Sequence, residues 1–338
     1  HDPRDLCRAV PGLMASLPIF TDTEILAARP ARNRVDHSHA YGTLVEPERT
    51  RSGRVENVAT LLLTNSECPF RCLMCDLWKN TTSEPVPPGM VAGQVREALA
   101  QLGIDSEDPV ASGVPHLKLY NSGNFFDRRA ISLADREQIA TLARQFRTVI
   151  VENHPRLCDQ QVIEFQDRLA HQLEVAIGLE TAHPDILAML NKQMTLDDFR
   201  RATGLLCENE IDVRSFILLK PPMLEEQEAI DWAVKSVEFS LDAGADCCTL
   251  IPLRDGNGMI EKLVEKGFHG PPALASLESA LAQCLAFERG RVFVDLWDVE
   301  RLACCSSCAP ARIERLQQMN LQQQVLPPVE CPLGCEEK

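Results

Sequence analysis

The stretch Cys68-Pro69-Phe70-Arg71-Cys72-Leu73-Met74-Cys75 decides the fold of this chain, because it places three cysteines directly after the apolar run 58–63. A strand that ends in such a loop can hold an iron–sulfur cluster, whose irons are bound by thiolates. Three thiolates leave one iron of a four-iron cluster open, and an open coordination position is what a catalytic metal site needs. We therefore predict a cluster bound by Cys68, Cys72 and Cys75.

Two other interpretations of these cysteines are weaker. A structural zinc ion needs four ligands, and the nearest further cysteines, Cys7 and Cys158, lie far along the chain. Buried cysteines also pack as small hydrophobic residues without any metal. Three thiols at this spacing directly after a strand rarely arise by chance, so the cluster is favoured.

The bulk properties indicate a large acidic protein without a membrane segment. The chain has 338 residues, 45% of them hydrophobic, and a formal net charge of −15. No apolar run approaches the ~20 residues of a membrane span, and the polar start predicts no signal peptide. The 14 cysteines then indicate metal ligands and reduced thiols rather than disulfides. We expect a cytoplasmic protein with no membrane partner, and the acidity argues against a broad nucleic-acid surface.

From residue 58 the sequence alternates between apolar runs and amphipathic segments. Strands are predicted at 58–63, 116–121, 148–151, 173–179, 213–219 and 247–252, and helices follow at 91–102, 131–146, 158–169, 196–208, 225–243 and 274–286. Six strand–helix units in a row indicate an α/β fold with a parallel sheet and helices outside. A doubly wound sheet would need a G-x-G-x-x-G loop after its first strand, and this loop has none.

Three regions follow from this pattern. Residues 1–57 are expected to form an N-terminal extension with a helix near 13–26. Residues 58–300 are expected to form the α/β domain, which ends in a further strand near 291–300. Residues 301–338 are expected to form a cysteine-rich, metal-binding tail.

The tail carries two close cysteine pairs, Cys305-x2-Cys308 and Cys331-x3-Cys335. Two pairs of thiolates at this separation are typical of a four-cysteine zinc site. An auxiliary iron–sulfur cluster is the alternative, and the pattern does not choose between them. Cys304, next to Cys305, leaves open which of the two would bind.

Longer motifs around the cysteines resemble a known family. The spacing C-x3-C-x2-C resembles the signature of the radical S-adenosylmethionine (SAM) superfamily. Further stretches together resemble the radical SAM family that contains the archaeosine-forming lyase of archaea, namely 64–82, Lys118-Leu119-Tyr120-Asn121-Ser122-Gly123-Asn124-Phe125-Phe126-Asp127, Gly178-Leu179-Glu180-Thr181, Leu190-Asn191-Lys192 and Arg315-Leu316-Gln317-Gln318-Met319-Asn320. The resemblance implies an open (β/α)6 partial barrel over 58–300. It also implies a [4Fe-4S] cluster whose open iron binds SAM and cleaves it to a 5′-deoxyadenosyl radical.

The chemistry of parallel barrels lies at the carboxyl ends of the strands, so the residues there are the candidate site. The resemblance implies SAM contacts from Asn121, Ser122, Gly123, Glu152, Glu180, Arg214 and Ser215. Ser122-Gly123-Asn124 departs from the Gly-Gly-Glu that is common there in the superfamily. Each glutamate has the alternative role of a helix cap, and the loop that of a simple turn. Lys220, Arg254 and Asn257 are the residues expected to contact a substrate.

The leading interpretation is therefore a radical SAM enzyme, a lyase or transferase, with an external one-electron reductant of the flavodoxin or ferredoxin type. The family implies cleavage of a carbon–nitrogen bond in a modified nucleoside of tRNA, although an acidic chain suits a polyanion poorly. One alternative is a radical SAM enzyme that inserts sulfur, or modifies a peptide or small molecule, with an auxiliary tail cluster. Another class altogether is a non-catalytic metal-binding adaptor.

Overall fold

The computed structural model describes residues 19–335, and eight strands in this range form one sheet in the order β1-β2-β3-β4-β5-β6-β7-β8. The strands are β1 (Gly42–Arg49), β2 (Val55–Leu62), β3 (His116–Tyr120), β4 (Thr148–Asn153), β5 (Gln172–Glu180), β6 (Asp212–Leu219), β7 (Cys247–Pro252) and β8 (Arg291–Val294). β1 runs antiparallel to β2, and each later strand lies parallel to the one before it.

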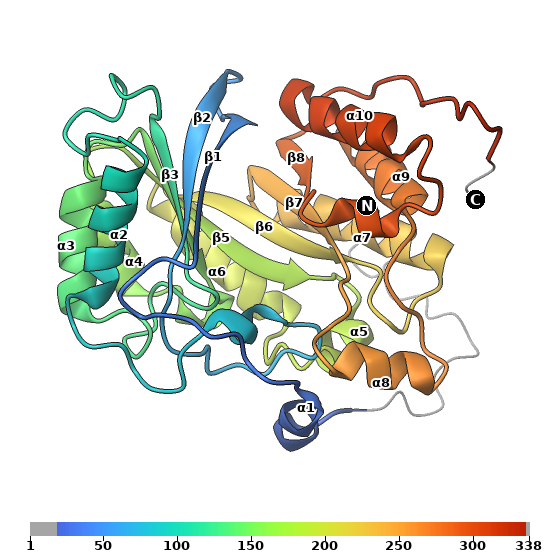
Figure 1. Cartoon of the computed structure of the whole chain (residues 1–338), viewed down its shortest axis with the longest axis horizontal. Coiled ribbons are helices and arrows are strands. Elements are labelled where there is room, and N and C mark those ends of the chain that lie inside the picture. Colours follow the sequence, from blue (N-terminus) through green and yellow to red (C-terminus); the bar gives the residue numbers. More distant parts are fainter. Residues whose placement is uncertain (1–18, 336–338) are drawn as a thin grey trace.

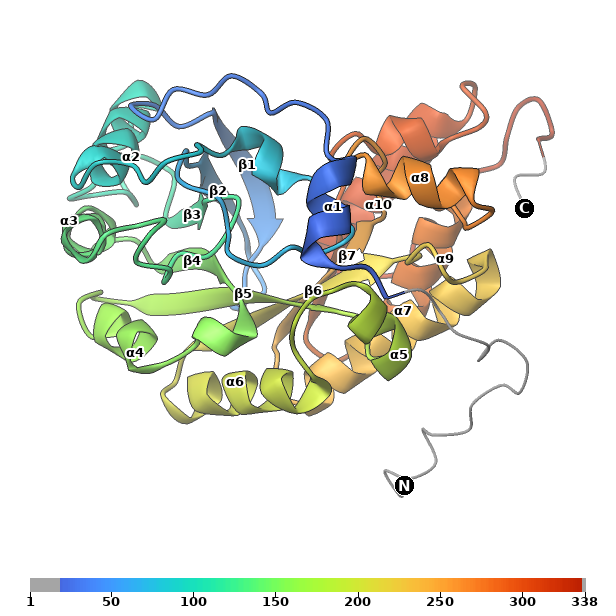
Figure 2. The same cartoon turned by 90° about the horizontal axis from the view of Figure 1, so that it is seen from below.

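Helices cover the outer face of this sheet, which curls into an open half-barrel (Figures 1 and 2). The helices on this face are α2 (Met90–Gln101), α3 (Leu133–Ala143), α4 (Gln160–Gln166), α6 (Leu196–Glu208), α7 (Glu226–Asp242) and α9 (Leu274–Leu285). Three further helices, α1 (Asp22–Ala28), α5 (Pro184–Met189) and α8 (Met259–Glu265), pack together in a separate apolar cluster. Helix α10 (Ala309–Gln322) follows near the end of the chain, and short 3-10 helices lie at Leu77–Asn80, Pro155–Leu157 and Val299–Leu302. The predicted α/β partial barrel is confirmed. Strand β1 and helices α5, α8 and α10 were not predicted.

Alternation along the strands gives the two faces of the sheet different environments. Leu117 and Leu119 on β3 belong to the apolar cluster beneath the helices. Tyr120 faces the interior of the barrel, where its ring centroid lies 6.1 Å from that of Phe216 on β6. Because β3 and β6 are not neighbours in the sheet, this contact crosses the interior.

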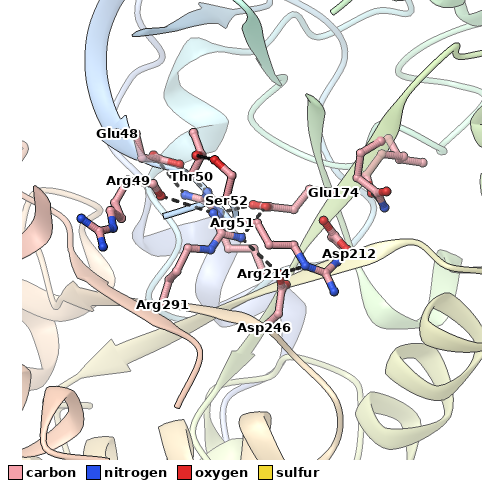
Figure 3. A network of polar contacts seen from close by, with 12 residues as sticks. Glu48, Arg49, Thr50, Arg51, Ser52, Glu174, Asp212, Arg214, Asp246 and Arg291 are labelled. Atoms are coloured by element: carbon pink, nitrogen blue, oxygen red, sulfur yellow. Dashed lines mark hydrogen bonds and ion pairs between the residues drawn. The ribbon is translucent and has the colours of Figure 1, made fainter. Parts of the chain in front are cut away.

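Buried charges fill the interior near the amino ends of the parallel strands (Figure 3). Arg214 on β6 binds Glu174 on β5 at 2.5 Å and Glu48 on β1 at 2.6 Å. Arg291 on β8 also binds Glu174, at 2.8 Å, and Lys118 on β3 pairs with Glu48. Burial alone would raise the pKa of Glu174, but Arg214 and Arg291 lower it to about 2. Except for Arg214–Glu174, these pairs join strands that are not neighbours in the sheet and so stabilise its curl.

Strand β1 lies within the region expected to be an extension. Its residue Pro47 pairs with Asn57 of β2. A proline is tolerated in an edge strand because its missing N–H takes no bond from the ladder. The helix expected near 13–26 overlaps α1, which begins after the capping residue Thr21. Residues 13–18 of that prediction, and Cys7, lie outside the described part of the chain.

Helix α10 packs against both β8 and β1, the two edge strands of the sheet. Figure 1 shows it beside β8 and α9. Arg312 and Arg315 of α10 pair with Glu278 of α9, at 2.7 and 3.3 Å. Within residues 19–335, no helix has both the length and the apolar character needed to cross a bilayer.

Candidate functional site

The cysteine loop follows β2 and is fixed by bonds to two distant segments. The N–H of Leu73, which is fully buried, donates to the carbonyl of Leu190 at 2.9 Å. The side chain of Asn257 donates to the carbonyl of Leu73 at 2.8 Å, and its Oδ1 accepts the N–H groups of Met259 and Ile260 at the start of α8. The segments after α5 and β7 therefore position the loop at the carboxyl end of the sheet.

The three thiols of the loop lie in a desolvated environment. Burial raises the pKa of Cys72 to about 12; the charge of Lys192 lowers it and that of Cys68 raises it. Burial also raises the pKa of Cys68 and Cys75. Metal binding requires thiolates, so an iron cluster would displace protons from these groups. The three cysteine residues as a whole nevertheless keep some solvent exposure.

The loop after β3 lies directly on Cys68. Asn124 Nδ2 donates to Cys68 Sγ at 3.0 Å. A Cβ added to Gly123 would lie 3.4 Å from Cys68 Cβ, an ordinary van der Waals contact, so the backbone of Gly123 lies beside Cys68. Ser122 adopts a positive φ of 53°, and its hydroxyl bonds that of Tyr41 at 2.8 Å. The structure thus brings the predicted SAM-binding loop to the predicted cluster loop.

Asn121 ties this loop to the segment after β2. Its Nδ2 donates to Asn65 Oδ1 at 3.0 Å, and its carbonyl accepts a bond from the side chain of Asn65. Its own Oδ1 is buried and has no protein hydrogen-bond partner. A buried acceptor without a partner costs free energy, so this oxygen is available to a donor of a bound group.

Glu152, near the end of β4, binds the backbone of the same loop. Its Oε1 accepts the N–H of Asn121 at 2.5 Å and that of Gly123 at 3.2 Å. Burial raises the pKa of this carboxyl to about 7, although the backbone donors act in the opposite direction. Glu152 therefore fixes the conformation of the loop that contacts Cys68.

Glu180, at the end of β5, forms an ion pair that extends the site. Its Oε1 lies 2.6 Å from Lys192 Nζ. Burial would lower the pKa of Lys192, but Glu180 and the thiol of Cys72 raise it. The pair provides one fixed positive and one fixed negative charge beside the cysteines.

Two aromatic rings that the sequence did not single out also belong to this group. Phe70, between the first two cysteines, stacks on His154 with ring centroids 3.7 Å apart. Burial lowers the pKa of His154 to about 3. The neutral imidazole has its Nε2 2.9 Å from the carbonyl of Lys192 and accepts the N–H of Arg156 at Nδ1. Phe70 and Lys192 lie in stretches that carry the family resemblance, 64–82 and Leu190-Asn191-Lys192, but neither was assigned a role there, and His154 lies outside those stretches.

The structure does not bring Arg214 and Ser215 to this group. Arg214 lies near the amino end of β6, where Glu174 and Glu48 bind its guanidinium. Ser215 points out of the barrel, and its Oγ lies 2.9 Å from that of Ser240 on α7. Successive side chains of a strand point to opposite faces, so these two cannot share one ligand.

The residues expected to contact substrate have different surroundings. Lys220, in a positive-φ conformation of 65° after β6, pairs with Glu226. Arg254, after β7, pairs with Asp295. Asn257 is buried beneath the cysteine loop, where its side chain is already used. Of the three, Arg254 is the one whose side chain keeps substantial exposure, at 26%.

The tail forms a separate cluster of four thiols. The sulfur atoms of Cys305, Cys308, Cys331 and Cys335 all lie within 4.8 Å of one another. Cys304 is exposed and is not part of the cluster. The chain can therefore bind a second metal at its tail, through Cys305 rather than Cys304.

The half-barrel and its cysteine loop define a metal-binding α/β-barrel protein, and sequence comparison gives its relatives. No family model matches the chain. An uncharacterised protein of Methanocaldococcus jannaschii is 24% identical over 234 residues, 66% of this chain and 63% of that protein. Archaeosine synthase subunit beta is 26% identical over 222 residues in Methanosarcina acetivorans, covering 64% of this chain and 62% of the relative. The protein of the same name in Thermococcus kodakarensis is 25% identical over 218 residues, covering 62% of this chain and 65% of the relative.

These relatives confirm the resemblance to the radical SAM family that contains the archaeosine-forming lyase. The match spans less than two thirds of the length of each relative. Among solved structures, the archaeal Elp3 of Methanocaldococcus infernus is 14% identical with a TM-score of 0.49, over 68% of this chain and 59% of that one. Methylornithine synthase is 11% identical with a TM-score of 0.49, over 81% of this chain and 75% of that one. At these scores neither structure bears on function.

Proposed function

We propose that this chain is a radical SAM enzyme. The single observation that carries the proposal is the contact of two loops at the carboxyl ends of β2 and β3, where Gly123 and Asn124 lie against Cys68. The donor set fits a four-iron cluster, because three thiols in one loop supply three of its four ligands. When bound, such a cluster and SAM would supply a 5′-deoxyadenosyl radical that abstracts hydrogen from a substrate.

The residues of the chain have distinct roles in this proposal. Cys68, Cys72 and Cys75 bind the cluster. Glu152 holds the backbone of the Gly123 loop, through its bonds to the N–H groups of Asn121 and Gly123. The Glu180–Lys192 pair offers a carboxylate to an ammonium group and an ammonium to a carboxylate, the two charged groups of an amino-acid moiety such as that of SAM. Phe70 and His154 exclude water on one side of the cysteines.

The reaction and substrate are finer proposals. The relatives named archaeosine synthase subunit beta support a modified nucleoside as the substrate, and the family resemblance implies cleavage of a carbon–nitrogen bond in it. An external one-electron reductant of the flavodoxin or ferredoxin type would reduce the cluster. The net charge of −15 weighs against a large polyanion, so we propose a nucleoside or small molecule ahead of whole tRNA. Reduced thiols are a condition for cluster assembly, which supports a cytoplasmic location.

The test is anaerobic reconstitution with iron and sulfide, followed by dithionite and SAM, with 5′-deoxyadenosine as the measured product. We expect 5′-deoxyadenosine from the wild type and none from Cys68→Ala. Cys207→Ala, at an exposed thiol of α6, should retain full product formation. Equal product from Cys68→Ala would overturn the assignment. Absence of product from a wild type with an intact cluster would favour a metal-binding adaptor.

Addition of bulk tRNA to the same assay separates the substrates. A several-fold rise in 5′-deoxyadenosine with intact tRNA would identify tRNA itself as the substrate. A rise with nucleosides released by digestion of that tRNA, but not with intact tRNA, would support the small-molecule form of the proposal.

A further inference from the structure

The four tail thiols lie at distances that fit one metal ion. Cys305 Sγ lies 3.7 Å from Cys331 Sγ, and Cys308 Sγ lies 3.6 Å from Cys335 Sγ. A tetrahedral zinc ion with Zn–S bonds of about 2.3 Å requires sulfur–sulfur distances of about 3.8 Å. In a four-iron cluster each thiolate binds a different iron, so the four sulfurs stand further apart than around one ion.

We propose that Cys305, Cys308, Cys331 and Cys335 bind a single zinc ion, and that this ion fastens the segment 323–335 to the start of α10. Four thiolates leave no open coordination position, so the ion is structural. Cys308 is the residue that precedes α10, and the negative charge of a four-thiolate zinc site is favourable at a helix N-terminus. The inference rests on the tail alone and does not depend on the radical reaction.

The fastened segment has little other support. Residues 324–335 contain no helix or strand. Their main described anchor is the guanidinium of Arg315, which donates to the carbonyl of Leu326 at 2.7 Å and to that of Pro327 at 2.8 Å. Most of the segment is exposed or half-exposed, so burial contributes little to its order. A metal site that closes this loop therefore supplies much of the free energy that keeps it in place.

Helix α10, which begins at the proposed ion, seals an edge of the sheet. Asn320 Oδ1 accepts the N–H of Val294 at 2.9 Å, and its Nδ2 donates to the carbonyl of Val294 at 2.9 Å. Gln323 makes the same pair of bonds to Val292, at 2.7 and 2.9 Å. Two side-chain amides thus satisfy the outer backbone groups of β8, as a neighbouring strand would. The proposed ion would therefore stabilise α10, which carries Asn320, and the residue that follows it, Gln323.

A zinc ion in the tail also bears on the reaction proposed above. An enzyme that inserts sulfur from an auxiliary cluster would need a second iron–sulfur centre, and the tail is the place where the sequence offers one. If the tail thiols bind zinc, they do not hold a second iron–sulfur cluster within the described residues. The structure therefore favours the enzymes that use one cluster over those that use two.

The test is metal analysis of the full chain, reconstituted anaerobically and desalted, with iron, zinc and sulfide measured per chain. We expect about one zinc and about four irons in the wild type. Cys331→Ser should lose the zinc and keep the iron, whereas Cys304→Ser should keep both. Cys68→Ala should lose iron and keep zinc, so that failure of the cluster assignment is distinguishable from failure of the tail assignment. About eight irons without zinc, or zinc retained in Cys331→Ser, would overturn the proposal.

Chelation of the wild type tests the fastening role without a mutation that might unfold the chain. Removal of zinc by a strong chelator should make the segment 323–335 cleavable by a low dose of protease, while the far-ultraviolet circular dichroism spectrum is retained. Re-addition of zinc should restore protection. An unchanged cleavage pattern after verified loss of zinc would show that the ion does not fasten the segment.

Discussion

Lys192 Nζ lies 2.6 Å from Glu180 Oε1, and both atoms occupy the space in front of Gly178 where any other residue would place its Cβ. The two charged groups come from the end of β5 and from the segment after α5. A Cβ built on Gly178 would lie less than 3.0 Å from each of them. The absence of a side chain at residue 178 therefore allows the ion pair to occupy this position, and a larger residue would require both flexible side chains to shift.

We expect Gly178→Ala to displace the Glu180–Lys192 pair. Inserting one methyl group into a packed site typically costs about 1–3 kcal/mol. The variant should therefore unfold at lower urea concentration and, if the pair contacts SAM, bind SAM more weakly than the wild type. Urea unfolding and equilibrium dialysis with SAM measure the two effects.

Gly204→Ala is the matched control for this prediction. Gly204 lies within α6, and a Cβ added there meets no atom within 4 Å. Alanine in a helix is favoured over glycine by about 0.5–1 kcal/mol, so the control should be slightly stabilised. Stabilisation of both variants would contradict the steric account of Gly178.

The buried ion network predicts a large loss of folding stability when Arg214 is replaced. Arg214→Met removes the partner of Glu174 and Glu48, and loss of one member of a buried pair costs about 3–5 kcal/mol. Arg168→Met, which removes an exposed pair with Glu137, should change stability by less than about 1 kcal/mol. Urea unfolding at pH 7 compares the two, and similar losses would argue against a structural role for the network.

Acid stability provides a second test of the same network. The pKa of Glu174 in the folded protein, about 2, lies below its ordinary value of 4.5. Its contribution to stability is therefore present above about pH 4.5 and is lost as the pH falls toward 2. Wild-type stability should decline over this window, and the decline should be shallower in Arg214→Met because the variant holds Glu174 less strongly in its charged form.

The raised pKa of Glu152 predicts a change of stability with pH in the opposite direction. Its pKa in the folded protein is about 7, above the ordinary value of 4.5, so the native state binds the proton more tightly than the unfolded state. Its stabilising contribution is complete below about pH 4.5 and is lost as the pH rises through 7. Glu152→Gln mimics the protonated form and should gain about 1–2 kcal/mol over the metal-free wild type at pH 8, but not at pH 5.

Thermal unfolding of both proteins between pH 5 and 8.5 measures this difference. Glu164→Gln, at an exposed position on α4, should follow the wild-type curve throughout. A constant offset between wild type and Glu152→Gln at all pH values would mean that Glu152 does not titrate in this window.

Asn257 should affect the iron site although it lies beneath the cysteine loop. Asn257→Asp keeps the acceptor that caps α8 but places a negative oxygen against the carbonyl of Leu73. An unsatisfied buried carbonyl costs about 1–3 kcal/mol, so the variant should melt earlier and retain less iron after desalting. Asn33→Asp, at an exposed asparagine, should match the wild type in both measurements. Full iron retention in Asn257→Asp would show that this anchor does not position the cysteines.

The sequence predicted most of the sheet because its parallel strands are short apolar runs followed by amphipathic helices. The strand predicted at 213–219 is β6 (Asp212–Leu219), and the one predicted at 247–252 is β7 (Cys247–Pro252). β1 escaped prediction because Glu46, Pro47 and Glu48 lack the pattern of a buried strand. Glu48 is buried because it meets Lys118 and Arg214, and such partners are known only once the chain has folded.

The candidate site was predictable to a similar degree. The loop after β3, Glu152 and Glu180 lie where strand ends were expected, near the cysteine loop, but their roles with a ligand stay predictions. Residue spacing could not tell Cys304 from Cys305, since the choice depends on where the chain returns with Cys331. The predicted strand 213–219 already places Arg214 at its amino end, so the SAM contact expected of Arg214 came from the family resemblance and not from its position.

The sealing of β8 by α10 also bears on the order in which the chain is made. Synthesis proceeds from the N-terminus, so β8 leaves the ribosome before Asn320 and Gln323, whose side chains cover its outer backbone groups. During that interval an unfinished chain presents an uncovered strand edge, which is a site for pairing with another unfinished chain. Chains released before residue 320 should thus aggregate more readily than the full chain, because their β8 edge stays uncovered.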